Sequence, residues 1–344
     1  MRAFSVFLVV VGHENFTFLE RLPIGFRNGA LGVNIFFVIS GFLITHLMLC
    51  ELEKTGRLSL KDFYIRRAFR IFPPYYAYLA VVAVTSAIHL YPVDWRTFLG
   101  AATYTVNYFP QPVVWVVAHS WSLCAEEHFY ILWPTCIAFL PRQTCLRIAG
   151  LIVFLSPLAR VATYYANRAS LDSIGFMSYT RLDGLMVGSF IALTLNLKQF
   201  RRMLHVLKLP VVAASAAVIL FLISPHYSSA FRSSVGFTVD AVCGGAVLLY
   251  AISHSESVVG KVLNQKVIKH FGVISYSLYL WQQIFEGPNT RLPPWNLLAV
   301  FACAEASYWC VEKPSFRLRD RFFKRTARVT ASDDRQLVNE IDAV

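Results

Sequence analysis

Long apolar runs, separated by short polar segments, recur along the whole chain. An apolar α-helix needs about 20 residues to cross a bilayer, so the runs predict an all-α, polytopic integral membrane protein with about ten transmembrane helices. Their expected positions are residues 2–19, 29–50, 69–90, 120–140, 148–166, 179–197, 209–224, 235–253, 270–286 and 295–312. The intervening stretch 91–119 fits an interfacial or re-entrant helix.

Composition and charge agree with this class, because 56% of the residues are hydrophobic and only 15% are charged. A net charge of +12 would suggest nucleic acid in a soluble protein, but cytoplasmic loops of membrane proteins collect Lys and Arg. With the N-terminus inside, 24 of the 32 Lys and Arg residues fall on the cytoplasmic side, six on the other, and two, Arg160 and Arg181, within spans. We therefore expect a multi-pass protein of the bacterial inner membrane, with the lipid bilayer as a partner, both termini in the cytoplasm and no nucleic-acid partner.

The two ends of the chain differ from the rest. Only ten apolar residues, Ala3 to Gly12, precede His13, which is about half a bilayer at 1.5 Å per residue. Either the first span continues through Glu14 to Leu19, or native residues are missing before Met1, or the run is a signal peptide. We expect a transmembrane domain over 1–312 and a cytoplasmic tail over 313–344, basic and then acidic, with a surface helix followed by disorder.

The seven cysteines lie mostly in apolar runs. They show neither C-x-x-C nor Cys/His ligand spacing, so the sequence predicts no disulfide framework and no metal site.

The segment His119–Pro134, HSWSLCAEEHFYILWP, places adjacent carboxylates inside an apolar stretch. Ionisable groups at membrane depth are costly and mark functional sites. On a helix, His119, Ser122, Glu126 and Tyr130 share one face, and Glu127 points away. Glu126 is therefore the stronger candidate of the two carboxylates.

His13 and a group of arginines are further candidates. His13 lies near mid-membrane, where a structural histidine without a partner would be costly, and its ordinary pKa near 6.5 suits a general base acting on a hydroxyl. In FYIRRAFRIFPPYY, Arg67 and Arg70 share a helix face at the cytoplasmic border. They are either positive-inside anchors or a fork for the phosphates of a cytoplasmic cofactor. The glycines of GALGVNIFFVISGF suit close helix packing instead.

Seven blocks resemble, in order, those of the acyltransferase family 3 membrane proteins, which O-acetylate bacterial glycans. These blocks are RAFSVFLVVVGH, GALGVNIFFVISGFLIT, FYIRRAFRIFPPYY, HSWSLCAEEHFYILWP, YTRLDGLMVGSFIA, ISYSLYLWQQ and VEKPSFRLR. The resemblance implies an acyl-CoA donor, acetyl-CoA above all, that enters from the cytoplasm, and transfer to a hydroxyl of a sugar or glycolipid acceptor. It assigns the essential histidine to His13, the Arg-x-x-Arg pair to Arg67 and Arg70, and the acidic residue to Glu126.

The chain departs from the family pattern at several positions. Many members have an extra turn with an acidic residue before the first arginine. Gln282 follows Trp281 where the family commonly has His, Asn34 stands where Asp is common, and His128 where Gln is frequent.

The expected mechanism is direct acyl transfer. Arg67 and Arg70 hold the CoA phosphates, His13 deprotonates the acceptor, and Glu126 orients the acceptor or tunes the histidine. Hydrogens of Ser40 or Trp121 are candidates to stabilise the oxyanion. Two further groups are candidates for a supporting role: Asp183, and the His119/Ser122 pair, whose alternative use is a covalent acyl-enzyme.

Two other function classes fit ten spans. A transporter or flippase for a polar or glycolipid substrate would also place charges such as Glu126, Arg160, Arg181, Asp183 and Glu305 within the membrane. A structural assembly subunit would leave the buried carboxylates unexplained. The absence of a visible inverted repeat, and an arginine pair that calls for an anionic ligand, favour the enzyme.

Overall fold

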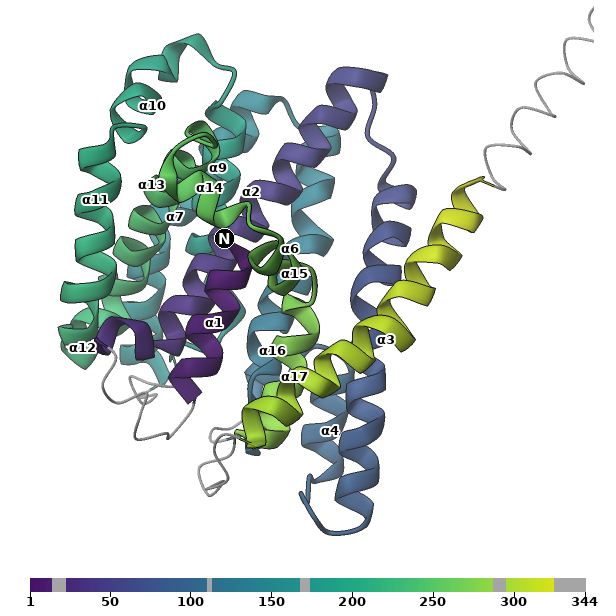
Figure 1. The fold of residues 1–344 in the computed structure, drawn as a ribbon. Coiled ribbons are helices and arrows are strands. Elements are labelled where there is room, and N and C mark those ends of the chain that lie inside the picture. The colour runs from purple at the N-terminus through teal and green to yellow at the C-terminus, as the bar shows by residue number, and fades with distance from the viewer. Residues whose placement is uncertain (14–22, 110–112, 168–173, 287–294, 325–344) are drawn as a thin grey trace, which may run out of the picture.

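The computed structural model describes residues 1–13, 23–109, 113–167, 174–286 and 295–324, and every regular element in these ranges is helical (Figure 1). The α-helices are α1 (Arg2–His13), α2 (Gly29–Thr55), α3 (Leu60–Ala87), α4 (Trp95–Ala102), α5 (Trp115–Ala118), α6 (Ser120–Phe139), α7 (Arg142–Asn167), α9 (Leu182–Thr194), α10 (Arg201–Leu207), α11 (Pro210–Val218), α12 (Ser229–Phe231), α13 (Phe237–Ser253), α14 (Val258–Leu263), α15 (Lys266–Val273), α16 (Ser275–Phe285) and α17 (Trp295–Ser307). Short 3₁₀ and π segments adjoin them: η2 (Ile24–Arg27), η3 (Val106–Tyr108), η4 (Ser178–Thr180), η5 (Lys198–Phe200), η6 (Ile219–Ile223), η7 (Ser224–His226), η8 (Arg232–Gly236) and η9 (Tyr308–Glu312).

A helix lies at each of the ten predicted positions, so the all-α class is confirmed for the described residues. Three helical stretches are long and apolar enough to cross a membrane: Gly29–Thr55, Arg142–Ala166 and Ser229–Ser253. Lys198–Leu207 and Pro210–His226, bent by 61°, make a fourth if the pair is one span. Ten membrane spans therefore remain a prediction, and the expected continuation of the first span beyond His13 lies outside the described residues. Within 91–119, α4 and α5 are short helices.

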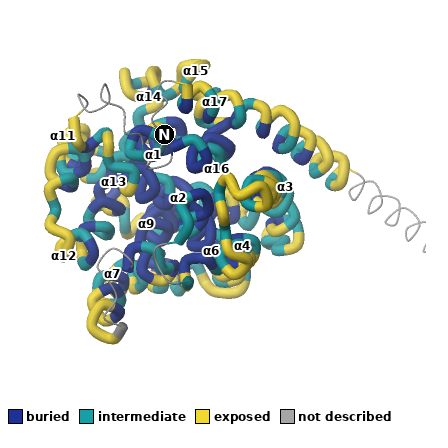
Figure 2. Tube along the Cα trace, turned by 90° about the horizontal axis from the view of Figure 1, so that it is seen from below, coloured by how far each residue is buried: buried dark blue, intermediate teal, exposed yellow. Residues whose placement is uncertain are grey.

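Helices α2 and α9 form the centre of the bundle, where Figure 2 shows the longest buried stretches. Two glycines allow this contact. A Cβ on Gly41 would lie 1.8 Å from the Leu185 carbonyl oxygen, and one on Gly188 would lie 2.0 Å from that of Val38. The backbones therefore touch directly, as small residues permit in membrane helices, and the close-packing role predicted for the glycines of α2 is confirmed at Gly41.

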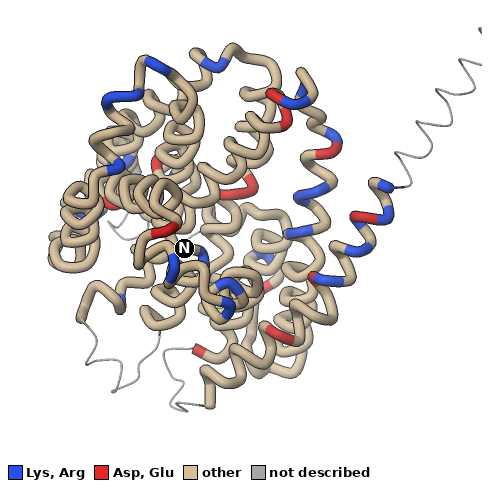
Figure 3. The backbone as a smooth tube through the Cα atoms, turned by 45° about the horizontal axis from the view of Figure 1, so that its top comes forward, with Lys and Arg blue, Asp and Glu red and all other residues tan. Residues whose placement is uncertain are grey.

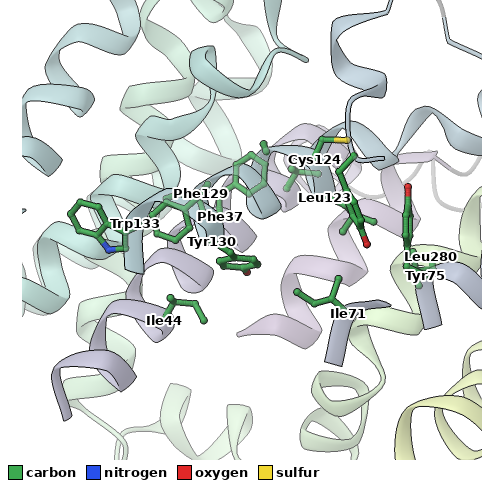
Figure 4. Close-up of a cluster of buried hydrophobic side chains, with 14 of the residues drawn as sticks. Phe37, Ile44, Ile71, Tyr75, Leu123, Cys124, Phe129, Tyr130, Trp133 and Leu280 are labelled. Carbon is green, nitrogen blue, oxygen red and sulfur yellow. The ribbon is translucent and has the colours of Figure 1, made fainter. Parts of the chain in front are cut away.

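Apolar side chains of α2, α3, α6 and α16 meet in one buried cluster (Figure 4). Phe37 from α2, Tyr75 from α3 and Phe129 from α6 are all buried in it. The outer face of α7 is different, because Leu151, Phe154 and Leu158 are exposed on it. An apolar outer face on a long helix suits contact with lipid tails.

A polar network is enclosed between α7, α9 and α13. Arg160 and Asp183 form an ion pair at 2.9 Å, and the side chains of both residues are fully buried. Arg160 also donates to the carbonyls of Thr180 and Ser234, at 2.7 and 2.8 Å, and Asp183 accepts from Thr238 at 2.6 Å. Buried charges are tolerated when they are paired and hydrogen-bonded in this way.

The last described segment crosses the outside of the bundle. Helical structure continues from η9 through residues 313–324, and in Figure 1 this helix runs past α3. The Ser315 hydroxyl donates to the Phe69 carbonyl of α3 at 2.6 Å. Lys and Arg residues line this helix and α3 (Figure 3). The surface helix predicted here is present over 313–324, and the predicted disorder falls on 325–344, outside the described residues.

Candidate functional site

Arginines gather in an open cavity of ≈ 400 Å³ between α2, α3 and the helix 313–324. The donors are Arg2, Arg66, Arg67, Arg70 and Arg319, and the acidic residue among the lining residues is Glu51. Glu51 is engaged by Arg66 at 2.7 Å. Among the described residues, Arg67 and Arg70 form no ion pair with a carboxylate, so the cavity holds an excess of positive charge.

A second, small cavity of ≈ 30 Å³, here called the charged cavity, adjoins the first, the arginine cavity. Arg2, Arg67 and Arg70 line both cavities. Here the arginines face both carboxylates of α6, Glu126 and Glu127. The prediction that Glu127 points away from the site is therefore wrong. Both carboxylates line one cavity, although helical periodicity separates them.

A third cavity, of ≈ 20 Å³, follows along the same helices. Apart from Ser5, Ser122 and Ser275, its lining is mostly apolar and aromatic, with Phe36 from α2 and Tyr279 from α16 among the side chains. It shares Phe36 and Ser275 with the second cavity. This third cavity is narrow and mostly apolar, and it lies next to the charged cavity; it is called the waist below.

His13 lines a fourth cavity, of ≈ 220 Å³, together with His119, Trp121 and Tyr279. Tyr279 also lines the waist. The His13 ring meets Trp115 edge to face at 5.5 Å between centroids. The structure thus brings His13 together with His119 and Trp121, which belong to a different block of the sequence.

The register of the helices shows that the four cavities follow one line through the bundle. On α2 the lining residues run from Gly29, at the histidine cavity, to Glu51, at the arginine cavity. These residues are 22 positions apart, about 33 Å at 1.5 Å per residue, which is close to the thickness of a bilayer core. On α6 the order is the same, from His119 through Ser122 to Glu126.

This order separates Glu126 from His13. Glu126 is 6% exposed and lines the small cavity of ≈ 30 Å³ that adjoins the arginine cavity, whereas His13 lies at the other end of α1 from Arg2. The structure does not bring the Glu126 carboxylate to the histidine ring. Its surroundings are the guanidinium groups of Arg2 and Arg67.

The Ser122 hydroxyl makes hydrogen bonds to groups other than the His119 ring. Its hydroxyl donates to the His119 carbonyl at 3.1 Å and lies 2.5 Å from the Tyr279 hydroxyl. Tyr279 donates to the same carbonyl at 2.9 Å. The contact between Ser122 and His119 is thus through the His119 backbone, and the described residues provide no base for a serine nucleophile. The His119 ring nitrogens have no hydrogen-bond partner among the described residues.

Two other candidates lie away from the histidine cavity. The buried Ser40 hydroxyl is 2.5 Å from the Tyr130 hydroxyl, and Tyr130 lines the charged cavity. Asp183 is held by Arg160 and Thr238 and lines none of the four cavities. Within the described residues, no group of three or more His, Cys, Asp or Glu side chains could hold a metal ion.

The departures from the family pattern have clear structural settings. Asn34 donates to the Phe237 carbonyl at 2.9 Å and accepts from Arg181 at 3.3 Å. The His128 ring contacts the Ser178 hydroxyl at 2.7 Å. Gln282 is fully buried. All three polar side chains lie in the interior or at its edge.

Three arginine or glutamate residues that line these cavities, Arg2, Glu127 and Arg319, are not among the candidates that the sequence analysis gives. For Arg2 and Arg319 the sequence offers one signal, since they lie in the first and the last of the seven matching blocks. The place of Arg319 at the arginine cavity depends on how the last helix packs on α3.

Known proteins similar to this chain include two O-acetyltransferases. The peptidoglycan O-acetyltransferase OatA of Listeria monocytogenes is 26% identical over 91% of this chain and 54% of its own length. The O-acetyltransferase OatA of Staphylococcus aureus is 28% identical over 95% of this chain and 57% of its own length. The chain thus spans little more than half the length of these relatives. No solved structure matches the chain. The family model described as an acyltransferase domain matches residues 1–304, and the chain therefore belongs to acyltransferase family 3.

Proposed function

We propose that this chain is a membrane-embedded O-acyltransferase that moves an acyl group, acetyl in the first instance, from cytoplasmic acyl-CoA to a hydroxyl of a sugar-containing acceptor. The observation that carries the proposal is the line of cavities from the arginines to His13. Peptidoglycan is the first acceptor to test, since the Listeria relative is named for it. We place the protein in the bacterial inner membrane, with the arginines and both termini on the cytoplasmic side, and the lining of one cavity by Arg2 and Arg319 supports a common side for the two ends.

The arginine end suits the donor. Arg67 and Arg70 can bind phosphate oxygens bidentately, as guanidinium groups do. The pantetheine arm would pass the charged cavity and the waist, which must widen to admit it, and bring the thioester to the larger cavity at His13. Positioning both reactants there supplies much of the rate.

His13 performs the proton transfers. Its Nε2 takes the proton of the acceptor hydroxyl as that oxygen attacks the thioester carbonyl. The C–S bond then breaks, and the leaving CoA sulfur receives the proton from the imidazolium. The ester and free CoA are the products. Trp121 and the His119 ring line the same cavity and are the candidate donors to the oxyanion. Ser40 lines no part of this cavity, so an oxyanion role for it has no support.

Glu126 remains a candidate for the site, with a role that fits its surroundings. Beside Arg2 and Arg67, its carboxylate would hold the guanidinium groups in place for the donor. The tail after 312 also takes part, because the helix 313–324 lines the arginine cavity. We therefore propose a transmembrane acyltransferase domain over 1–312 with a cytoplasmic extension, 313–344, whose first helix belongs to the donor site.

The alternative, a transporter or flippase, needs a passage for the whole substrate. The two middle cavities measure ≈ 30 and ≈ 20 Å³, about the volume that one or two water molecules occupy. An enzyme that admits only the acyl-pantetheine arm requires less widening of these two cavities than a carrier that admits a whole glycolipid. This comparison favours the enzyme.

The deciding experiment compares cells with and without the protein. Surface polysaccharides, glycolipids and peptidoglycan are digested and their O-acyl content is measured by mass spectrometry. Loss of one O-acyl ester on deletion, restored by the native chain and not by His13→Gln, supports the proposal. Unchanged ester content together with a changed distribution of a glycolipid between membrane leaflets would support the transporter instead.

A further inference from the structure

We propose that the arginine cavity binds the 3′-phosphorylated ADP end of the donor and that Arg319, in the C-terminal helix, is a phosphate-binding residue of this site. This inference rests on the proposed function, and it identifies the part of the donor that the cavity recognises. Nothing in the family resemblance assigns a role to Arg319.

The charge of the cavity matches such a ligand. Five arginines and one glutamate line it, so its side chains carry a net charge of +4 (five minus one). A diphosphate together with a phosphomonoester carries about −4 near neutral pH. Arg2 also supports an anionic ligand here, because its Nε is buried, has no hydrogen-bond partner among the described residues, and can therefore donate to a phosphate oxygen.

The cavity also has an apolar wall. Leu43, Leu47 and Met48 of α2 and Phe63 of α3 line it beside the arginines. Flat, weakly polar rings such as adenine bind well against apolar and aromatic side chains. With ≈ 400 Å³, the cavity lies within the range of volumes that hold small ligands. A wall of this kind next to guanidinium groups suits a nucleotide better than free phosphate.

The C-terminal helix is fixed where Arg319 can serve this cavity. Besides the hydrogen bond of Ser315 to α3, the Phe316 ring lies under two guanidinium groups, with the Arg319 carbon at 5.3 Å and the Arg70 carbon at 5.8 Å from its centroid. The Arg66 carbon lies 5.9 Å from the Phe323 centroid. These cation–π contacts connect two arginines of α3 with aromatic rings of the last helix, and the Phe316 ring contacts arginines of both helices.

Arg319 already touches one carboxylate, since it forms a 2.8 Å pair with its neighbour Asp320. The Asp320 side chain is 59% exposed, and exposed pairs contribute little. Phosphate can therefore replace Asp320 at low cost. Arg321, two residues on, is exposed and does not line the cavity, which makes it a matched control of equal charge on the same helix.

The test measures binding to the purified full chain in lipid nanodiscs, by calorimetry. The ligands are acetyl-CoA, 3′-dephospho-acetyl-CoA and acetyl-pantetheine, and the variants are Arg319→Gln, Arg319→Lys and Arg321→Gln. We expect the native chain to bind these ligands in that order of decreasing affinity. Arg319→Gln should weaken acetyl-CoA about tenfold, the effect of losing one charge-assisted bond, and reduce the preference over the dephospho ligand. The affinity of Arg319→Lys for acetyl-CoA should lie between those of Arg319→Gln and the native chain. The affinity of Arg321→Gln should equal that of the native chain.

Two results would overturn the proposals, and they differ. If the native chain binds acetyl-CoA but Arg319→Gln and Arg321→Gln behave alike, the site at Arg319 is wrong and the proposed function stands. If the native chain binds none of the three ligands, the acyl-CoA donor itself is wrong. In transfer assays, Arg319→Gln should raise KM for acetyl-CoA with kcat unchanged, whereas a fall in kcat alone would contradict a binding role.

Discussion

The Nδ1 atom of His13 lies 2.9 Å from the carbonyl oxygen of Val9, one helical turn earlier on α1. A carbonyl only accepts hydrogen bonds, so Nδ1 carries the proton and Nε2 carries the lone pair. The local helix thus selects the tautomer that a general base requires. His13 also lines the ≈ 220 Å³ cavity, and the Gln282 side chain is a hydrogen-bond partner of its ring.

We expect His13→Gln to reduce acyl transfer by about 10² to 10⁴, the usual contribution of a positioned base, while acetyl-CoA binding and protein yield stay near native. Activity of the native chain should fall as the pH drops below the pKa of His13, because the imidazolium cannot accept a proton. Initial rates from pH 5 to 8 check this. A stable Gln variant with native turnover would remove His13 from the mechanism.

Arg67→Ala and Arg70→Ala should each weaken acetyl-CoA binding by one to two orders of magnitude, because charge-assisted bonds to phosphate contribute a few kcal/mol at most. Lys replacements should recover part of the loss, since an ammonium cannot make the bidentate contact. Binding titrations on purified protein provide the measurement. Equal affinities in the native and both Ala variants would mean that the pair only anchors the chain in the membrane.

Asp183→Ala should destabilise the fold, because it leaves Arg160 charged, buried and without its carboxylate. Removing one partner of a buried ion pair typically costs about 3–5 kcal/mol. Thermal unfolding in detergent, followed by size-exclusion chromatography, should show a clear fall in the unfolding midpoint of Asp183→Ala. The midpoint of Asp183→Asn should lie between those of Asp183→Ala and the native chain. A variant that is fully stable yet inactive would favour the supporting role in the reaction for which the sequence makes Asp183 a candidate.

Gly41→Ala should loosen the centre of the bundle, since the new Cβ would lie 1.8 Å from the Leu185 carbonyl oxygen. Overpacking of this kind costs about 1–3 kcal/mol or more. Gly150→Ala is the matched control, because the nearest atom to its Cβ is 3.6 Å away on the Phe190 ring. The midpoint of thermal unfolding should fall for Gly41→Ala alone, and equal midpoints would show that α2 and α9 adjust to the methyl group.

The sequence by itself determined the helical class and the candidates within single segments. Apolar runs specify helices because a membrane leaves the backbone no other partners. Helical spacing correctly aligned His119, Ser122 and Glu126, which line successive cavities of one path. The pairing of Arg67 with Arg70 is likewise local, because residues three apart meet on a helix.

Only the tertiary structure decided which of these groups meet. Glu127 lines the same small cavity as Glu126, and Asp183 forms an ion pair with Arg160, 23 residues away on another helix. Arg319 reaches the arginine cavity through the packing of the last helix on α3. Contacts between distant segments depend on how whole helices pack, and no periodicity within one segment encodes that arrangement.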